Sequence, residues 1–250
     1  MVPKEYYGRL FTKEQLSVDY HSEAFTLESM IKVDKQLRCK RCYSQIEEDW
    51  QLPEGQYYCR ACIVFGRNQE GKELYYFPSK TSEIEFPALK WLGKLTPYQA
   101  EVSEKLLETY QKQKDSLVHA VTGAGKTEMI YKIVAYVLEG KGNVAIASPR
   151  VDVCRELFLR MQRDFTCSIS LLHAESEPYD GSPLVIATTH QLLKFYQNFD
   201  LVIVDEVDAF PFVGNVMLNH AVEQAKKETG RYIYLTATST ISVSYTHLRA

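Results

Sequence analysis

The sequence lacks any uninterrupted run of eighteen or more apolar residues, and its opening stretch, MVPKEYYGRLFTKEQL, has no apolar core. These absences exclude a transmembrane helix of ordinary length and a secretory signal peptide. Internal repeats and low-complexity segments are missing as well. We therefore expect a cytoplasmic chain whose 250 residues form one large domain, or an ordinary domain with a small one beside it.

An excess of positive charge is also missing, since the formal net charge is −3 and the isoelectric point is about 6.1. A globally basic nucleic-acid binder is thus unsupported, although a local basic groove stays open because electrostatic steering depends on where charges lie. Cysteine is scarce, with six residues. Disulfides are rare in the cytoplasm, so we expect Cys154 and Cys167 to be small buried hydrophobic side chains.

The other four cysteines form two pairs, Cys39-x-x-Cys42 and Cys59-x-x-Cys62, separated by sixteen residues. This spacing can bring four thiolates to the corners of a tetrahedron around Zn²⁺. The letters PEG between the pairs indicate a turn, and the layout is that of a zinc ribbon. A closed four-sulfur site has a structural role, because it leaves no position for water. We expect so small a ribbon to be unfolded without metal.

The cysteine pairs also admit a redox dithiol or a set of four incidental residues. A thioredoxin-like dithiol requires a βαβ context, which the sequence does not show here. The surroundings of the pairs are ambiguous too, because a cluster of basic residues suits a ribbon that faces nucleic acid, whereas the acidic stretch 47–49 suits a mixed solvated surface. The basic residues are Lys35, Arg38, Lys40, Arg41 and Arg60.

Short apolar runs alternate with helical patterns from Lys94 onward. The runs are SLVHAV, NVAIASP, SISLLHA, PLVIATT, LVIVDEV and RYIYLTAT. Most are nearly continuous in Val, Ile, Leu and Ala, which is typical of strands buried on both faces. One helical pattern begins after Thr96, a good N-cap before Pro97. Two others occupy residues 127–139 and 152–163. The alternation predicts an α/β fold in which helices cover both faces of a parallel sheet.

These patterns divide the chain into five parts. We expect an N-terminal segment over residues 1–35, the zinc ribbon over 36–66, a connector over 67–93, the α/β domain over 94–240 and a tail over 241–250. The tail follows the letters TATST and brings no further helical pattern. We therefore expect a truncated chain with a foreign tail from about residue 243.

The stretch AVTGAGKT, residues 120–127, is one residue away from a strict phosphate loop, GxxxxGK[ST], because Ala replaces the first Gly. Gly123 and Gly125 permit the tight backbone that points N–H groups at phosphate oxygens. The stretch follows a predicted strand and opens a predicted helix, whose dipole also favours phosphate. We expect Lys126 to bind the β- and γ-phosphates of ATP and the Thr127 hydroxyl to hold Mg²⁺.

The stretch LVIVDEVDAF brings two carboxylates to the end of a predicted buried strand. A carboxylate there is costly unless a cation compensates it. We expect Asp205 to bind Mg²⁺ through water and Glu206 to polarise the water that attacks the γ-phosphate, so that both are catalytic together with Lys126. The alternative is an acidic surface turn without a role.

The loop AxTGxGKT followed by DEVD resembles the superfamily-2 helicases and translocases of the DEAD-like group, which usually have Ala at the position of Ala120. The resemblance implies that residues 94–240 are a RecA-like ATPase domain, the first of two. Gln99 in LTPYQ resembles the glutamine that recognises adenine. The resemblance thus implies that ATP and Mg²⁺ are bound by Gln99, Thr122, Gly123, Ala124, Gly125, Lys126, Thr127 and Asp205.

Three further segments resemble motifs of the same group, in the same order. ASPRVDVCREL (147–157) and ATTHQLL (187–193) resemble segments that contact one nucleic-acid strand, and LTATST (235–240) resembles the motif that couples hydrolysis to movement. The implied strand contacts are Pro149, Arg150, Thr188 and Thr189, and the implied coupling residues are Thr236, Ala237 and Thr238.

The ribbon ahead of the ATPase domain, together with LTPYQ, SPRVDVCREL and DEVDAFP, resembles the ComFA-type late competence proteins from about residue 36 to 240. That family helps Gram-positive bacteria to internalise single-stranded transforming DNA. The resemblance implies an ATP-driven translocase on single-stranded DNA that works with other competence or DNA-processing proteins at the inner face of the membrane. It also implies a second RecA-like domain, which this chain lacks, so the chain alone is expected to be weak or inactive.

Two alternative functions stay open. A primosomal restart or repair helicase shares LTxxQ and the phosphate loop, but its cysteines follow the ATPase motifs, whereas here they precede them. A non-catalytic module that binds nucleotide and nucleic acid would account for the missing second domain.

Overall fold

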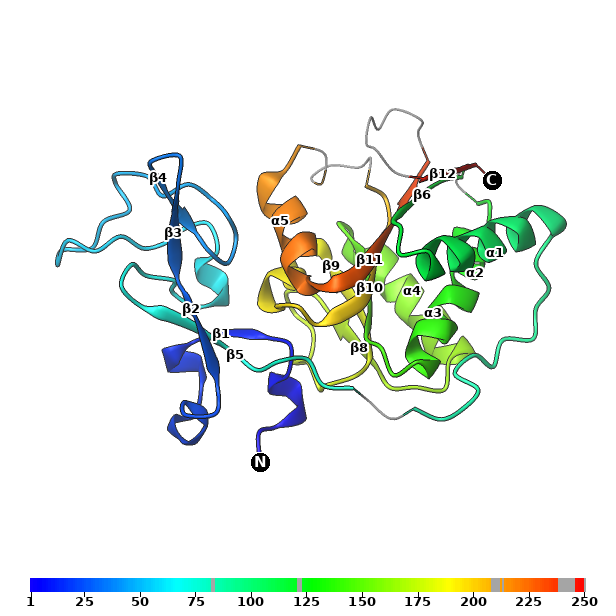
Figure 1. The fold of residues 1–250 in the computed structure, drawn as a ribbon, viewed down its shortest axis with the longest axis horizontal. Helices are drawn as coiled ribbons and strands as arrows, with labels where there is room; N and C mark the ends of the chain where they lie inside the picture. The colour runs from blue at the N-terminus through cyan, green and yellow to red at the C-terminus, as the bar shows by residue number, and fades with distance from the viewer. Residues whose placement is uncertain (82–83, 121–122, 208–211, 213, 238–245, 250) are drawn as a thin grey trace.

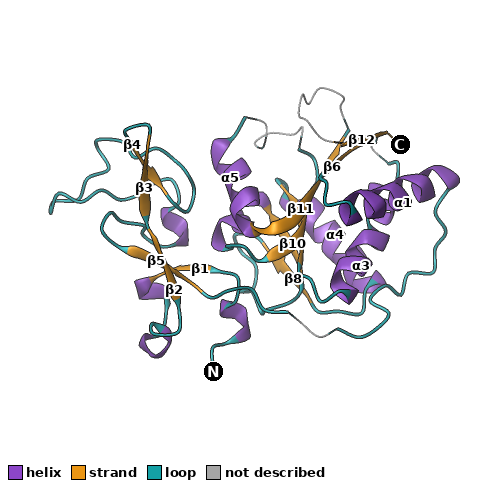
Figure 2. Ribbon diagram, viewed as in Figure 1, coloured by secondary structure: helices purple, strands orange, loops and turns teal. Residues whose placement is uncertain are grey.

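A computed structural model describes residues 1–250 apart from 82–83, 121–122, 208–211, 213, 238–245 and 250. A small N-terminal region with the paired cysteines precedes a larger α/β domain (Figures 1 and 2). None of the helices in this described part is long and apolar enough to cross a membrane.

The larger domain contains one sheet of seven strands, in which all neighbours are parallel, in the order β12-β6-β11-β10-β7-β9-β8. The strands are β6 (Ser116–His119), β7 (Val144–Ser148), β8 (Ile169–Leu172), β9 (Leu184–Thr188), β10 (Phe199–Val204), β11 (Lys226–Thr236) and β12 (Thr246–Arg249). All six predicted apolar runs form strands of this sheet. The predicted parallel α/β architecture is confirmed.

The seventh strand lies in the segment that the sequence predicts to be a tail. β12 pairs with β6 along its whole length, from Thr246 opposite Ser116 to Arg249 opposite His119. An edge strand leaves a row of backbone N–H and C=O groups unpaired. Pairing with β12 supplies hydrogen-bond partners to that edge of β6, a long-range gain that no local pattern in the tail signals.

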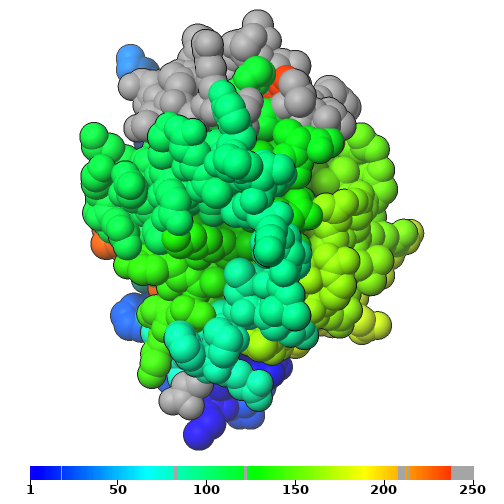
Figure 3. Space-filling model, turned by 90° about the vertical axis from the view of Figure 1, so that its right-hand side faces the viewer, coloured from blue at the N-terminus to red at the C-terminus, as the bar shows by residue number. Residues whose placement is uncertain are grey.

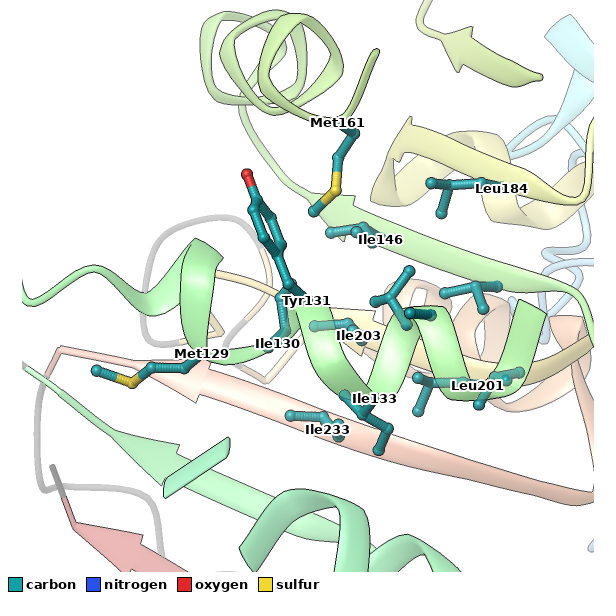
Figure 4. Close-up of a cluster of buried hydrophobic side chains, with 14 of the residues drawn as sticks. Met129, Ile130, Tyr131, Ile133, Ile146, Met161, Leu184, Leu201, Ile203 and Ile233 are labelled. Carbon is teal, nitrogen blue, oxygen red and sulfur yellow. The ribbon is translucent and has the colours of Figure 1, made fainter. Parts of the chain in front are cut away.

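The central strands β7, β9 and β10 are buried on both faces, and their side chains alternate between two apolar clusters. Ile146 and Ile203 belong to the cluster under helices α1, α3 and α4, whereas their neighbours Ala145 and Val202 belong to the cluster under α5. Figure 4 shows the first cluster, in which Tyr131 at the start of α3 points toward Met161 of α4. Burial on both faces explains why these runs are almost entirely apolar, because every residue of such a strand faces a packed layer.

Helices cover both faces of the sheet, as predicted. They are α1 (Pro97–Gln111), α2 (Lys126–Met129), α3 (Tyr131–Glu139), α4 (Val151–Asp164), the 3₁₀ segment η5 (Thr189–Lys194) and α5 (Val216–Ala225). α1 begins at the predicted cap, where the Thr96 side chain accepts a hydrogen bond from the Gln99 N–H. The single helix predicted over 127–139 is interrupted at Ile130, so α2 and α3 are separate.

The connector packs between α3 and α4 on the face shown in Figure 3. The Ala88 N–H donates to Glu139 Oε1 of α3 at 2.9 Å, and the Lys90 N–H donates to the Asp164 carbonyl at the end of α4 at 2.9 Å. These bonds attach the connector to the α/β domain.

The N-terminal region consists of a three-stranded sheet and the cysteine-bearing ribbon. Its elements are η1 (Lys4–Tyr6), β1 (Leu10–Thr12), η2 (Lys13–Gln15), η3 (Val18–Tyr20), β2 (Phe25–Glu28), β3 (Met30–Val33), β4 (Gln36–Cys39), η4 (Ile63–Phe65) and β5 (Glu73–Tyr76). The sheet order β1-β5-β2 unites the predicted N-terminal segment with the predicted connector. The ribbon is therefore an insertion between β2 and β5. The predicted domain boundaries themselves stay predictions.

The ribbon opens with the hairpin β3–β4. Asp34 and Lys35 connect its strands with φ angles of 48° and 66°, the left-handed geometry that suits a two-residue hairpin turn. A second turn lies at the predicted letters PEG, where the Gly55 N–H donates to the Leu52 carbonyl at 2.9 Å and Gly55 has φ of 92°. This second turn lies between the two cysteine pairs, where Gln51 and Tyr57 pair antiparallel, so the chain reverses direction from one pair to the other.

Candidate functional site

The phosphate loop joins the end of β6 to the start of α2. Gly123 and Gly125 have φ angles of 82° and 76°, a region that residues with a Cβ rarely adopt. At Gly125 a Cβ would also lie 2.4 Å from Nε2 of Gln99. The sequence places glycine at these two positions because the loop has to turn tightly before Lys126 begins the helix.

Gln99 is attached to this loop from α1. Its Nε2 donates to the Ala124 carbonyl at 2.9 Å, and its Oε1 accepts from the Thr96 N–H at 2.9 Å. The side chain thus links the start of α1 to the phosphate loop. Its recognition of adenine stays a prediction.

The two predicted carboxylates follow the end of β10, two strands away from β6 in the sheet. The Asp205 N–H donates to the Ala147 carbonyl of β7 at 2.8 Å, which continues the sheet pairing to this residue. Asp205 Oδ1 lies 3.7 Å from Nζ of Lys126, and both side chains are largely buried. The cation that a carboxylate at this strand end requires is therefore the lysine of the phosphate loop.

One cavity of about 340 Å³ joins these elements. Lys126 and Glu206, the two residues on which the ATPase prediction depends, both line it. Its walls are the phosphate loop, the start of α4 and the ends of β10 and β11. The lining residues are Gly123, Gly125, Lys126, Thr127, Arg150, Val153, Glu156, Leu157, Arg160, Asp205, Glu206 and Ala237.

Glu206 is held in an unusual conformation. Its φ is 54°, a left-handed value that costs a non-glycine residue on the order of 1–3 kcal/mol and that is concentrated at functional sites. Its N–H donates to Asp205 Oδ1 at 2.9 Å, and Oε1 lies 3.8 Å from Nη1 of Arg150. Burial raises the pKa of the Glu206 carboxyl, and the Arg150 charge opposes this shift only in part. A carboxylate with a raised pKa is a better proton acceptor.

Two charged residues of the cavity are missing from the sequence prediction. Arg160 Nη1 lies 3.4 Å from Oε1 of Glu128, which joins α4 to α2 across the cavity wall, and Arg160 Nη2 lies 2.7 Å from Oε1 of Glu156. The spacing of Glu156 and Arg160, four residues apart in a helix that follows the segment ASPR, is the available signal. It indicates an exposed ion pair rather than a cavity wall.

The predicted coupling segment lies beside the phosphate loop because β11 is the neighbour of β6. The Ala120 N–H donates to the Thr236 carbonyl at 3.0 Å, and His119 Nε2 lies 3.2 Å from the Ala237 carbonyl. Thr122 and Thr238, for which the sequence predicts nucleotide binding and coupling, lie outside the described residues. A coupling role stays a prediction for Thr236 and Ala237.

The predicted strand-contacting residues differ in exposure. Pro149 is half-buried and Arg150 is exposed, and Arg150 Nη2 pairs with Asp152 Oδ2 at 2.6 Å. Thr188 is 8% exposed and Thr189 is 0% exposed, so these two side chains do not reach the surface. Contact with nucleic acid stays a prediction for all four residues.

The four paired cysteines converge in the ribbon. Their sulfur atoms all lie within 4.8 Å of one another, and each residue is 0% exposed. Three of the Sγ–Sγ distances are 3.5 Å, 3.6 Å and 3.7 Å. Four sulfurs about 2.3 Å from a tetrahedral zinc ion would lie about 3.8 Å apart, close to these three distances. The cluster fits the predicted structural zinc site.

Asn68 supports the cysteine cluster from outside and is another residue that the sequence prediction lacks. Its Nδ2 donates to Cys39 Sγ at 3.1 Å and to the Ser29 carbonyl at 2.7 Å. Contacts with the other three thiols, and then this amide, lower the pKa of Cys39. A donor fixed beside a sulfur stabilises the thiolate form that a metal requires.

The ribbon is docked on α5 of the α/β domain. Gln224 Nε2 donates to the Arg41 carbonyl at 3.2 Å, and His220 Nε2 lies 3.0 Å from the Lys40 carbonyl. The His220 ring also stacks on Tyr43, with centroids 5.1 Å apart. The four cysteines share one apolar cluster with α5 residues such as Leu218. The first cysteine knuckle is thus held by the helix that connects the loop after Glu206 to β11.

Comparisons with known proteins identify the family and the relatives that this chain resembles. Residues 92–241, more than half of the chain, match the family described as Type III restriction enzyme, res subunit (ResIII). Over 239 residues the chain is 57% identical to the competence protein ComFA of Streptococcus pneumoniae (strain ATCC BAA-255 / R6). The matched region covers 94% of this chain and 54% of that protein. Over 237 residues it is 35% identical to the competence protein ComFA of Bacillus subtilis (strain 168), covering 91% and 51%.

The chain therefore spans about half the length of the curated relatives it matches. Among solved structures, a hypothetical ATP-dependent RNA helicase from Sulfolobus tokodaii matches with a TM-score of 0.49 and 18% identity, over 62% of this chain and 54% of that one. A DEAD box protein from Methanococcus jannaschii matches with a TM-score of 0.49 and 16% identity, over 60% and 49%.

Proposed function

We propose that this chain, which belongs to the ResIII helicase-type family and is a ComFA-type competence protein, carries the first motor domain of a larger enzyme. The proposed enzyme is an ATP-driven translocase on single-stranded DNA. The observation that supports this most directly is that Lys126 and Glu206 line one cavity beside a phosphate loop. Those two side chains come from segments eighty residues apart in the sequence. If the acidic segment were a surface turn without a role, Glu206 would not be expected to line the same cavity as Lys126.

The phosphate loop and four side chains of the cavity, Lys126, Thr127, Asp205 and Glu206, have parts in the proposed hydrolysis. The loop N–H groups and Lys126 would bind the phosphates, and the Thr127 hydroxyl and Asp205 would hold Mg²⁺, which would supply positive charge against the phosphate oxygens. The Lys126–Asp205 contact, at 3.7 Å, gives way when the lysine turns to the phosphates. Glu206 accepts a proton from the attacking water, a role for which its raised pKa suits it.

Movement along DNA is proposed to require the second RecA-like domain, which would close over ATP and open after hydrolysis. Strand contacts at Arg150 and its neighbours would then alternate with contacts on the other domain. Such contacts are made mostly with phosphates and weaken with salt. Other competence proteins at the inner face of the membrane are the proposed partners, and the cytoplasm is the proposed compartment.

Replacement of Glu206 by Gln tests the proposed chemistry. In the full-length protein we expect Glu206→Gln to bind ATP normally but to lower ATP hydrolysis, stimulated by single-stranded DNA, about 10²–10⁴-fold, because the proton acceptor is lost. Glu108→Gln, an exposed residue of α1, is the matched control. Normal turnover by Glu206→Gln would contradict the assignment. If the wild-type protein and the control both bind ATP but do not hydrolyse it, the result would favour a non-catalytic module.

The raised pKa of Glu206 predicts a pH dependence. The carboxyl acts as a base only when it is ionised, so ATP hydrolysis should decrease as the pH is lowered. Because the pKa is raised, this decrease should begin at a higher pH than it would with an ordinary glutamate. The folded state also binds this proton more tightly than the unfolded state, so the ionised carboxyl destabilises the fold above its raised pKa. Glu206→Gln should therefore raise Tm at pH 7.5, measured against Glu108→Gln, and an unchanged or lower Tm would contradict this sign.

A further inference from the structure

A second cavity, of about 160 Å³, lies where the N-terminal region meets the α/β domain. It shares no lining residue with the nucleotide cavity. Arg9 enters it from the segment before β1, which pairs with Phe195 after η5. Lys194 enters it from the end of η5, and residues 172–179, after β8, form the remaining wall. Three segments that are distant in sequence thus meet around one small space.

Two cationic side chains share this cavity. Burial lowers the pKa of Arg9, and burial together with the Arg9 charge lowers the pKa of Lys194. In the part of the chain that the structure describes, no carboxylate lies within ion-pairing distance of either side chain. Desolvated charges in proteins are normally paired with an opposite charge. Two neighbouring like charges without such a partner therefore require compensation from another source.

Nearby groups compensate these charges only in part. The Arg9 guanidinium lies 5.0 Å from the ring centroid of Phe11 and 6.0 Å from that of Tyr179, and Lys194 Nζ lies 5.5 Å from that of Phe65. Such rings orient a cation but accept little hydrogen bonding. Arg9 Nε is buried and has no hydrogen-bond partner among the described residues. Glu5 acts on Arg9 from a distance, and the side chain of Glu177 is exposed at the rim.

His173 adds a third donor. The residue is 8% exposed and lines the cavity. Its Nδ1 accepts a hydrogen bond from the Glu175 N–H at 3.2 Å. An imidazole whose Nδ1 accepts carries its proton on Nε2, so that nitrogen is a donor. The cavity wall thus combines a guanidinium, an ammonium and an N–H donor.

We propose that this cavity binds a phosphate group, held by Arg9, Lys194 and Nε2 of His173. A forked guanidinium together with an ammonium is the donor set that proteins use for phosphate. A bound phosphate would supply the acceptor that buried Arg9 Nε lacks and would separate the two cations. The group belongs either to a nucleic-acid backbone or to a free phosphate compound, and the two sources are separated by experiment.

The test uses Arg9→Gln and Lys194→Gln, each made together with Lys126→Ala so that the nucleotide cavity does not contribute. Binding of inorganic phosphate is measured by calorimetry, and binding of a fluorescent single-stranded oligonucleotide by anisotropy at several salt concentrations. Each substitution should weaken binding about tenfold in at least one assay. For the oligonucleotide it should also reduce the slope of log affinity against log salt by about 1. Lys114→Gln, an exposed lysine before β6, is the charge control.

The outcomes distinguish the sources. Weaker binding of both probes, or of the oligonucleotide alone, identifies a backbone phosphate, and weaker binding of inorganic phosphate alone identifies a free phosphate compound. Lys194→Gln, which leaves the Arg9 ring contacts in place, covers the case in which Arg9→Gln lowers Tm. Binding equal to that of Lys114→Gln in both assays for both variants overturns the proposal. The ATPase assignment is untouched by that result, since the experiment is done without Lys126.

Discussion

Lys126→Ala is expected to weaken ATP binding on the order of 100-fold, because two charge-assisted contacts to the phosphates are lost together. Among the described residues that line the cavity, Lys126 is the only lysine. Its carboxylate neighbour, Asp205, is 14% exposed and loses this cation in the variant. The remaining negative charge would itself repel a triphosphate, which adds to the expected loss.

The matched control is Lys132→Ala, since Lys132 lies in α3 outside the cavity lining and forms a surface ion pair with Glu104. Such pairs contribute little to stability. Titration of a fluorescent ATP analogue measures both variants, and thermal melting reports whether the fold is intact. Lys126→Ala with an affinity within a few-fold of Lys132→Ala would contradict the nucleotide-site assignment, whatever happens at the ribbon.

Removal of zinc is expected to unfold the ribbon and to loosen α5. Metal binding in small four-ligand units is worth about 10–16 kcal/mol, which is comparable to the whole stability of a typical domain, about 5–15 kcal/mol. The cysteines share an apolar cluster with α5, whose His220 and Gln224 contact backbone carbonyls of the first knuckle. Cys62→Ser, or a strong chelator, should therefore abolish zinc binding and increase amide hydrogen exchange in α5 as well as in the ribbon.

Cys167→Ser is the matched control, because Cys167 is half-buried and lies outside the metal cluster. Metal analysis and hydrogen exchange should give wild-type values for this variant. Loss of zinc with unchanged exchange in α5 would contradict the mechanical link between ribbon and helix. Zinc affinity of Cys62→Ser equal to that of the wild-type protein would contradict the metal site itself.

The strands and the chemical motifs were predictable because their causes are local. A strand buried on both faces must be apolar at nearly every position, and β7 and β10 show that pattern. The phosphate loop needs glycine where φ is positive, which marks Gly123 and Gly125. The CxxC spacing is a local requirement of a knuckle. Fold class, metal ligands and candidate nucleotide residues follow from such patterns.

Other features depend on groups that meet only after folding. Arg160 of α4 lines the cavity beside the phosphate loop and pairs with Glu128 of α2, and Asn68 reaches Cys39 because the chain returns to β5 after the ribbon. The docking of the ribbon on α5 and the cavity at Arg9 and Lys194 are likewise contacts between distant segments. Nothing in the neighbouring letters signals them.

Residue order alone was therefore enough for whatever depends on backbone conformation and on burial along one strand or loop. It specified a parallel α/β domain, a phosphate loop ending at Lys126 and a four-cysteine ribbon. The three-dimensional packing set which distant side chains share a cavity, including Glu206 with that lysine, and where the ribbon is attached. The physical reason is that desolvation and charge pairing depend on distance in space, which the sequence does not contain.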